Sequence, residues 1–268
     1  MIFQKVQKEI KEQYALLLKK SLSKEEKITL FNSLLKKAEK SRMEDYIEWL
    51  NALICMANSL YAKAETHLVK SISINKDFFL AYEALGNLYF HLKNYEKAKD
   101  SYLEAIKVNK DWCYSYESLG IIYFILKDYE NSEKCFYKAI EIDKSVTTSY
   151  KGLGNIYNLY GDLKKSEEFY LKSLEIDKND FYIYNNLGNI YLDLKDYCKA
   201  KDFFEKSIEL EKNCMPTYIN LVYSYYKLED YEKVKKIIED TINLFPDEED
   251  IVNLVNIIEI KENRQIKL

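Results

Sequence analysis

Two histidines and five cysteines are the side chains with which this chain could hold a metal ion or provide a reactive nucleophile. His67 and His91 belong to no HExxH sequence, and their surroundings give no metal-binding or catalytic geometry. The cysteines form no CxxC pair, so we expect neither a zinc site nor a disulfide framework, and we expect them to be reduced and mostly buried. They are Cys55, Cys113, Cys135, Cys198 and Cys214.

The other common patterns of catalysis and cofactor binding are also absent from the sequence. It contains no Walker sequence and no GxGxxG, and no nucleophile has a base at a recognisable spacing. We therefore expect no catalytic residue, no cofactor and no metal, and we do not expect the chain to be an enzyme.

The composition indicates a folded, helical protein. Of 268 residues, 47% are hydrophobic, 31% are charged and only two are prolines. No apolar run approaches the roughly 18 residues that a membrane span requires, and the first residues do not resemble a signal peptide. We therefore expect a cytoplasmic location.

A period of 34 residues organises most of the chain. Leu-Gly pairs end at Gly86, Gly120, Gly154 and Gly188, and three columns of tyrosines keep the same step. The columns are Tyr82, Tyr116, Tyr150, Tyr184 and Tyr218; Tyr89, Tyr123, Tyr157, Tyr191 and Tyr225; and Tyr61, Tyr95, Tyr129, Tyr197 and Tyr231, with Leu163 in place of a tyrosine between Tyr129 and Tyr197. The tyrosines therefore belong to the architecture and not to a cofactor site.

Two sets of short polar side chains mark helix starts with this period, because they can accept hydrogen bonds from the free N–H groups of a first turn. Each unit is thus predicted to be a helical hairpin, with its glycine where the two helices cross closest. The first set is Asp77, Asp111, Ser145, Asn179, Asn213 and Asp247, and the second is Asn94, Asp128, Asp162, Asp196 and Asp230.

The run Tyr82, Leu85, Gly86, Tyr89, Ala98, Tyr102 and Ala105 resembles the tetratricopeptide repeat. The resemblance implies an all-α, right-handed superhelical solenoid of helix-turn-helix units. It is strong over 79–112, 113–146, 147–180 and 181–214, and weaker over 45–78 and 215–248. Residues 1–44 are expected to add two amphipathic helices, with capping-box spacing at Ser23–Glu26 and Ser41–Glu44. The apolar face of the first is Phe3, Val6, Ile10, Tyr14 and Leu17, and that of the second is Ile28, Phe31, Leu34, Leu35 and Ala38. Residues 249–268 are expected to form a C-terminal capping helix.

By the same resemblance, the first helices of the units line a concave groove that binds a peptide or helix of a partner protein. Amides that follow the signature glycine could bond a peptide backbone, or could be no more than the common residue at that position. The groove is expected to include Asn87, Tyr114, Glu117, Phe124, Lys151, Asn155, Asn158, Tyr182, Asn185, Asn186, Asn189 and Tyr223. Lys151, Asn155 and Asn186 also match part of the family's carboxylate clamp, but Pro216 and Asn220 stand where its other two basic residues belong.

The function indicated is a non-enzymatic scaffold for an unidentified protein partner. Residues 1–44 carry a net charge of +5, which leaves −9 for the remainder of a chain whose net charge is −4. An acidic repeat region argues against an RNA-binding helical repeat, because phosphate contacts require a basic stripe. Self-assembly through the basic N-terminal helices stays open as an alternative, and the oligomeric state is not predicted.

Overall fold

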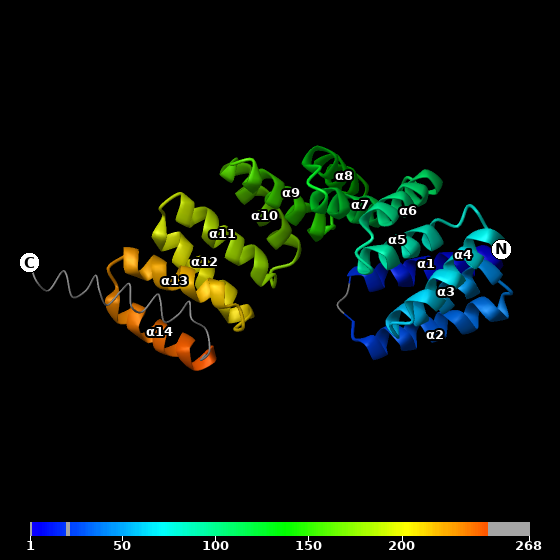
Figure 1. The fold of residues 1–268 in the computed structure, drawn as a ribbon, viewed down its shortest axis with the longest axis horizontal. Helices are drawn as coiled ribbons and strands as arrows, with labels where there is room; N and C mark the ends of the chain where they lie inside the picture. The colour runs from blue at the N-terminus through cyan, green and yellow to red at the C-terminus, as the bar shows by residue number, and fades with distance from the viewer. Residues whose placement is uncertain (1, 20–21, 246–268) are drawn as a thin grey trace, which may run out of the picture. The chain divides into compact units, whose positions relative to one another are not determined.

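The computed structural model describes residues 2–19 and 22–245, and in this part the chain forms helices and no strand. The all-α fold class is therefore confirmed (Figure 1). Two compact units divide the chain, Met1–Ser149 and Tyr150–Leu268. The helices are α1 (Ile2–Lys19), α2 (Lys24–Lys40), α3 (Glu44–Ala57), α4 (Tyr61–Ile74), α5 (Phe79–His91), α6 (Tyr95–Val108), α7 (Cys113–Ile125), α8 (Tyr129–Ile142), α9 (Thr147–Leu159), α10 (Leu163–Ile176), α11 (Phe181–Asp193), α12 (Tyr197–Leu210), α13 (Met215–Lys227) and α14 (Tyr231–Leu244).

From α3 onward, each 34-residue unit contains one pair of helices, a first helix with an odd label and a second helix with an even label. The second helices begin where the sequence predicted. Asn94, Asp128, Asp162, Asp196 and Asp230 each cap a second helix, and each side chain accepts a hydrogen bond from the backbone N–H three residues later. This set of caps is confirmed.

The predicted caps of α5, α7, α11 and α13 are wrong by one residue, and Asp247 lies outside the described residues. The N-cap of α5 is Phe78 and not Asp77, and the N-cap of α7 is Trp112 and not Asp111. The cause lies upstream, because the Asn75 side chain accepts from the Asp77 N–H at 3.0 Å and so closes a turn before the helix starts. In the second unit, α11 and α13 likewise begin one residue later than predicted.

One predicted capping box exists and the other does not. Ser23 and Glu26 bond each other's backbone N–H groups at the start of α2, as the spacing indicated. Ser41 instead ends α2, and Met43 is the N-cap of α3 without a side-chain bond. The turn between α2 and α3 therefore occupies the residues that the second box would need.

The signature glycines lie at close helix crossings, as predicted. A methyl group on Gly86 of α5 would lie 2.6 Å from the Tyr102 ring of α6, and one on Gly154 of α9 would lie 2.5 Å from the Tyr170 ring of α10. Real contacts are not this short, so a side chain here would force the two helices apart.

A second periodic backbone feature was not predicted. The turn between the two helices of each pair contains one residue in the left-handed region, at Ser59, Lys93, Lys127, Gly161, Lys195 and Glu229. Gly161, with φ of 76°, is the single glycine in this set, so the other five hold a conformation that costs free energy for a side chain.

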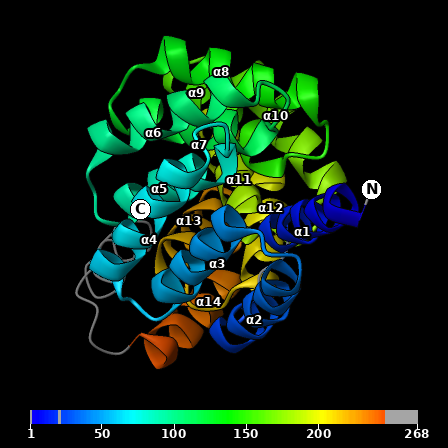
Figure 2. The same ribbon diagram turned by 90° about the vertical axis from the view of Figure 1, so that its right-hand side faces the viewer.

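The N-terminal helices α1 and α2 are part of the first unit, where Figures 1 and 2 show them in blue beside α3. Each buries the apolar face that the sequence predicted, through Ile10, Tyr14 and Leu17 of α1 and through Phe31, Leu34 and Ala38 of α2. The predicted C-terminal capping helix lies outside the described residues.

Candidate functional site

The cysteines and histidines form no reactive site in the described part of the chain, where no cluster of three metal-binding side chains occurs. All five cysteines are free, but only Cys113 is fully buried and Cys198 is exposed, with the other three half-buried, so the prediction that they are mostly buried is wrong. Burial raises the pKa of the Cys113 and Cys135 thiols to about 12, which keeps both protonated and unreactive at neutral pH.

Both histidines make local hydrogen bonds within the first unit. His67 Nδ1 lies 2.6 Å from Glu48 Oε2, and His91 Nε2 lies 2.6 Å from the Tyr61 hydroxyl. Lys70 also contacts Glu48, and bonds from Lys70 and His67 lower the pKa of that carboxyl against the opposing effect of its burial. Each histidine therefore joins helices of the repeat, and the two do not meet.

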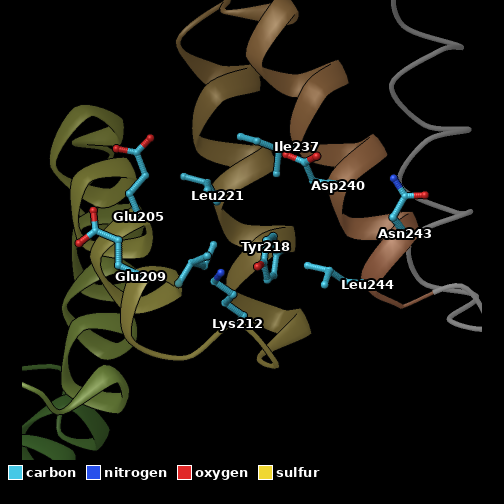
Figure 3. Close-up of a pocket in the computed structure, with 10 residues that line it drawn as sticks. Glu205, Glu209, Lys212, Tyr218, Leu221, Ile237, Asp240, Asn243 and Leu244 are labelled. Atoms are coloured by element: carbon cyan, nitrogen blue, oxygen red, sulfur yellow. The ribbon is translucent and has the colours of Figure 1, made fainter.

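An open hollow of about 770 Å³ lies between α12, α13 and α14 (Figure 3). A smaller hollow in the first unit is lined by the residues at the same repeat positions, so that Lys76, Tyr82 and Glu104 there correspond to Lys212, Tyr218 and Asp240 here. Because the hollow recurs with the repeat, we assign it to the packing of adjacent hairpins and not to a specific site.

The first helices of the second unit, α9, α11 and α13, carry most of the predicted binding residues on one side, which we call the second-unit face. Lys151 Nζ lies 2.8 Å from Asp180 Oδ2. The Tyr170 hydroxyl donates to Asn155 Oδ1 at 2.6 Å and accepts from Asn186 Nδ2 at 3.3 Å. The structure thus brings together the three residues that matched the carboxylate clamp, but it pairs the lysine with an aspartate.

Two more amides connect α11 to α13. Asn185 Oδ1 accepts from the Thr217 hydroxyl at 3.0 Å, and Asn189 Oδ1 accepts from Asn220 Nδ2 at 2.9 Å. Asn189 differs from Asn155 because Phe204 stands where Tyr170 supplies a hydroxyl one unit earlier. The amides of this face therefore form a row in which each already has a hydrogen-bond partner within the protein.

Aromatic and polar side chains stand exposed beside that row. Tyr182 is 51% exposed and Tyr223 is 42% exposed, and Asn158 is also exposed. The Lys227 ammonium lies 5.3 Å from the centroid of the Tyr223 ring, so one charge already contacts this aromatic patch. The second-unit face thus offers apolar rings next to amides, a combination suited to a peptide backbone.

The corresponding side of the first unit, formed by α3, α5 and α7, is covered by α1, and we call it the first-unit face. Tyr14 of α1 packs against Trp49 of α3, and Tyr114 of α7 donates to the Ala15 carbonyl of α1 at 3.4 Å. The Lys19 ammonium at the end of α1 bonds Asp143 at 3.0 Å and Ser145 at 2.9 Å. The helix α1 therefore crosses three successive hairpins.

The predicted binding residues of the first unit lie on or beside this covered face. Asn87 Oδ1 accepts from the Tyr102 hydroxyl at 2.7 Å, and Asn87 also bonds the buried Tyr14 side chain of α1. Glu117 accepts from Ser149 at 3.4 Å, and Phe124 packs against Tyr129 with ring centroids 5.4 Å apart. The helical spacing of Ile10, Tyr14 and Leu17 indicated that one face of α1 is buried. It did not indicate which surface of the protein covers that face.

Paired helices in register, glycine at the crossings of four successive pairs and a capped second helix define a helical-hairpin repeat protein. Residues 79–112, 113–179 and 181–214 match models of the tetratricopeptide repeat, and these matches span about half of the chain. The chain belongs to the tetratricopeptide repeat family. No curated protein sequence matches it.

Solved structures share the fold at low sequence identity. PilF of Pseudomonas aeruginosa aligns at 13% identity and a TM-score of 0.71, over 80% of this chain and 98% of that one. PilW, described as a widely conserved type IV pilus biogenesis factor, aligns at 16% and 0.68, over 79% and 98%. YrrB, described as a TPR protein with an unusual peptide-binding site, aligns at 19% and 0.59, over 70% and 97%. None of the described helices is long and apolar enough to cross a membrane.

Proposed function

We propose that the protein is a non-enzymatic interaction scaffold that binds an extended segment or a helix of a partner protein on the second-unit face. The observation that carries this proposal is the exposure of Tyr182 and Tyr223 beside the amides of α9, α11 and α13. Exposed aromatic side chains tend to supply most of the free energy at protein interfaces. The peptide-binding site named for YrrB supports the same class of function.

The chemistry of the face favours recognition of a peptide backbone over recognition of a terminal carboxylate. Amides both donate and accept hydrogen bonds, so a row of them can pair with an extended segment of varied sequence. Lys151 is already neutralised by Asp180, which weakens it as the anchor of a carboxylate clamp. The proposal includes a cytoplasmic location, where the five free cysteines would stay reduced.

The test begins with affinity capture of the full chain's partner from the native host and its identification by mass spectrometry. The affinity of that partner is then measured by calorimetry for the wild-type chain and for a Tyr182→Ala, Tyr223→Ala double variant. We expect the double variant to bind at least tenfold more weakly. The control is Leu171→Ala, because Leu171 is 40% exposed but lies on α10, the second helix of its pair, and its loss should leave binding unchanged.

The result that rejects the proposal is also specific. If the double variant binds as well as wild type while charge reversals in α1 or α2 abolish binding, the site lies on the N-terminal helices. Light scattering of the full chain over a range of concentrations tests the remaining alternative, which is self-assembly through those helices.

A further inference from the structure

The first-unit face contains polar side chains that α1 buries without satisfying. In the described residues, four buried side-chain atoms have no hydrogen-bond partner, and all four belong to first-unit residues at or beside α3, α5 and α7. They are Trp49 Nε1, Glu83 Oε2, Trp112 Nε1 and Ser115 Oγ. Each such group costs about 1–3 kcal/mol, so the unpaired groups that lie against α1 make its docking costly in free energy.

Glu83 is the most costly of these groups, because it is a carboxyl with only 1% of its surface exposed. One repeat later the corresponding pair is bonded, since Ser149 donates to Glu117 at 3.4 Å. The residues at the same positions in the covered face are Glu83 and Ser115, and they do not pair. The Trp112 indole lies near Glu83 without forming a hydrogen bond of ordinary geometry.

The helix α1 brings no cation to this carboxyl. Tyr14 approaches Glu83 closely enough for their charged forms to repel, but its side chain bonds Asn87 instead. The nearest lysine along α1, Lys11, places its ammonium 5.2 Å from the centroid of the Phe79 ring. A cationic side chain at the position of Tyr14 would therefore lie beside the unpaired carboxyl of Glu83.

We propose that the first-unit face is a second binding site, that α1 occupies it as a displaceable internal ligand, and that its external ligand is a partner helix with arginine at the position of Tyr14. The partner would keep apolar residues at the spacing of Ile10 and Leu17, which are buried in α1. Arginine is favoured over lysine because its planar guanidinium can stack on Trp49, which the Tyr14 ring now contacts edge to face, while it pairs with Glu83. This site is separate from the second-unit face and does not depend on it.

The proposal is tested with the full chain and three labelled synthetic peptides of residues 2–19. One peptide has the native sequence, one carries Tyr14→Arg, and one carries Tyr14→Ala. The tethered α1 competes with all of them at an effective concentration on the order of millimolar. We expect the arginine peptide to bind at least tenfold more tightly than the native peptide, the alanine peptide not to bind, and hydrogen exchange in the chain's own residues 4–19 to rise as the arginine peptide binds.

Variants of the chain make the test specific. Lys19→Ala removes the contacts of α1 with Asp143 and Ser145 and should strengthen binding of every peptide that binds, whereas Leu16→Ala changes an α1 side chain that is 56% exposed and should not. Glu83→Gln should remove the preference for arginine.

Three results would each overturn the proposal. The first is equal binding of the native and arginine peptides to both wild type and the Lys19→Ala variant. The second is binding of the arginine peptide with unchanged protection of α1 or with no dependence on Glu83. The third is a concentration-dependent dimer that the native peptide dissociates, because the ligand would then be α1 of a second copy. The double variant of Tyr182 and Tyr223 should bind the arginine peptide like wild type, which separates failure at one face from failure at the other.

Discussion

The ring of Tyr14 in α1 meets the ring of Trp49 in α3 edge to face, with their centroids 5.0 Å apart and their planes inclined by 78°. Trp49 is fully buried, and its other aromatic neighbours, Tyr46 and Phe78, belong to the repeat region. This contact connects the N-terminal helix to the core of the first hairpin, in which Ile10 and Leu17 of α1 are also buried.

Replacing Tyr14 by alanine is expected to release α1 from the first unit. The substitution removes a buried aromatic side chain and should cost about 3 kcal/mol or more. Trp49 and Trp112 are the only tryptophans, so their fluorescence should shift to longer wavelength as water reaches the face. Leu16→Ala, on the exposed side of α1, should leave the emission maximum in place. Unchanged emission from a folded Tyr14→Ala chain would show that other groups shield both indoles.

The docking of α1 is expected to depend on pH through Glu83. Burial raises the pKa of this carboxyl from its ordinary value of 4.5 to about 8. Between pH 4.5 and pH 8, Glu83 keeps its proton while α1 covers it and loses the proton when α1 is released. Docking of α1 should therefore be strongest below about pH 4.5 and should weaken as the pH rises to about 8. The groups that face Glu83 are Tyr14, Tyr102, Tyr114 and Trp112, and burial raises the pKa of all three tyrosines, so none of the four groups should ionise in this range.

Hydrogen exchange of α1, corrected for the intrinsic pH dependence of amide exchange, measures this effect. A Glu83→Gln chain should keep the same protection from pH 5 to pH 8. If wild type shows an equally flat profile, Glu83 does not control the docking of α1.

A side chain at Gly154 is expected to loosen the second unit locally. Leucine there would clash with the Tyr170 ring, which lies 2.5 Å from the position of a methyl group. Because repeat proteins are stabilised mainly by contacts between neighbouring units, amide protection should fall around residues 150–175 and less elsewhere. Asn158→Ala, at an exposed position of the same helix, is the control. Uniform loss along the whole chain would instead indicate a single cooperative core.

The left-handed turn positions offer a stabilising substitution. Glu229 has φ of 62°, and glycine adopts this conformation without the steric cost that a side chain carries. Glu229→Gly should raise the free energy of unfolding by about 0.5–1 kcal/mol, whereas Lys235→Gly in the middle of α14 should lower it by about 1 kcal/mol. Thermal unfolding of both variants measures the contrast, and a decrease for both would mean that the entropy lost by glycine outweighs the relief of strain.

The two signature asparagines of the second unit should respond differently to alanine. Asn155 accepts from the Tyr170 hydroxyl, so Asn155→Ala should lower the melting temperature as well as any affinity for the partner. Asn189 accepts instead from Asn220 on the neighbouring first helix, so Asn189→Ala should weaken binding with little effect on melting. Calorimetry with the captured partner and thermal unfolding separate the two effects, and identical behaviour of both variants would refute this distinction.

The period of the sequence was sufficient to predict the hairpins, because helix spacing, caps and crossing glycines are local. Asn94 caps α6 as predicted, since the bond spans only three residues. The start of α5 was misplaced by one residue because the Asn75 side chain closes a turn before Asp77.

The candidate sites depend on contacts that no local pattern encodes. Tyr14 was correctly assigned to a buried face, but its position against Trp49 and Asn87 follows from the path of the whole first unit. The polar cluster at Glu83 could not be predicted for the same reason. Glu83 and Glu117 hold the same position in successive repeats, and the sequence does not show that α1 covers one of them.

The ion pair between Lys19 and Asp143 joins residues 124 positions apart, and this separation has a consequence for synthesis. At roughly 5–20 residues per second, a ribosome needs roughly 6 to 25 seconds to extend the chain from one residue to the other. Hairpins form from neighbouring residues and can fold as they emerge, whereas α1 must wait for its last contact. During each round of translation the nascent chain therefore presents an amphipathic helix with its apolar side incompletely covered, and chaperones that recognise such helices can meet it before the mature protein exists.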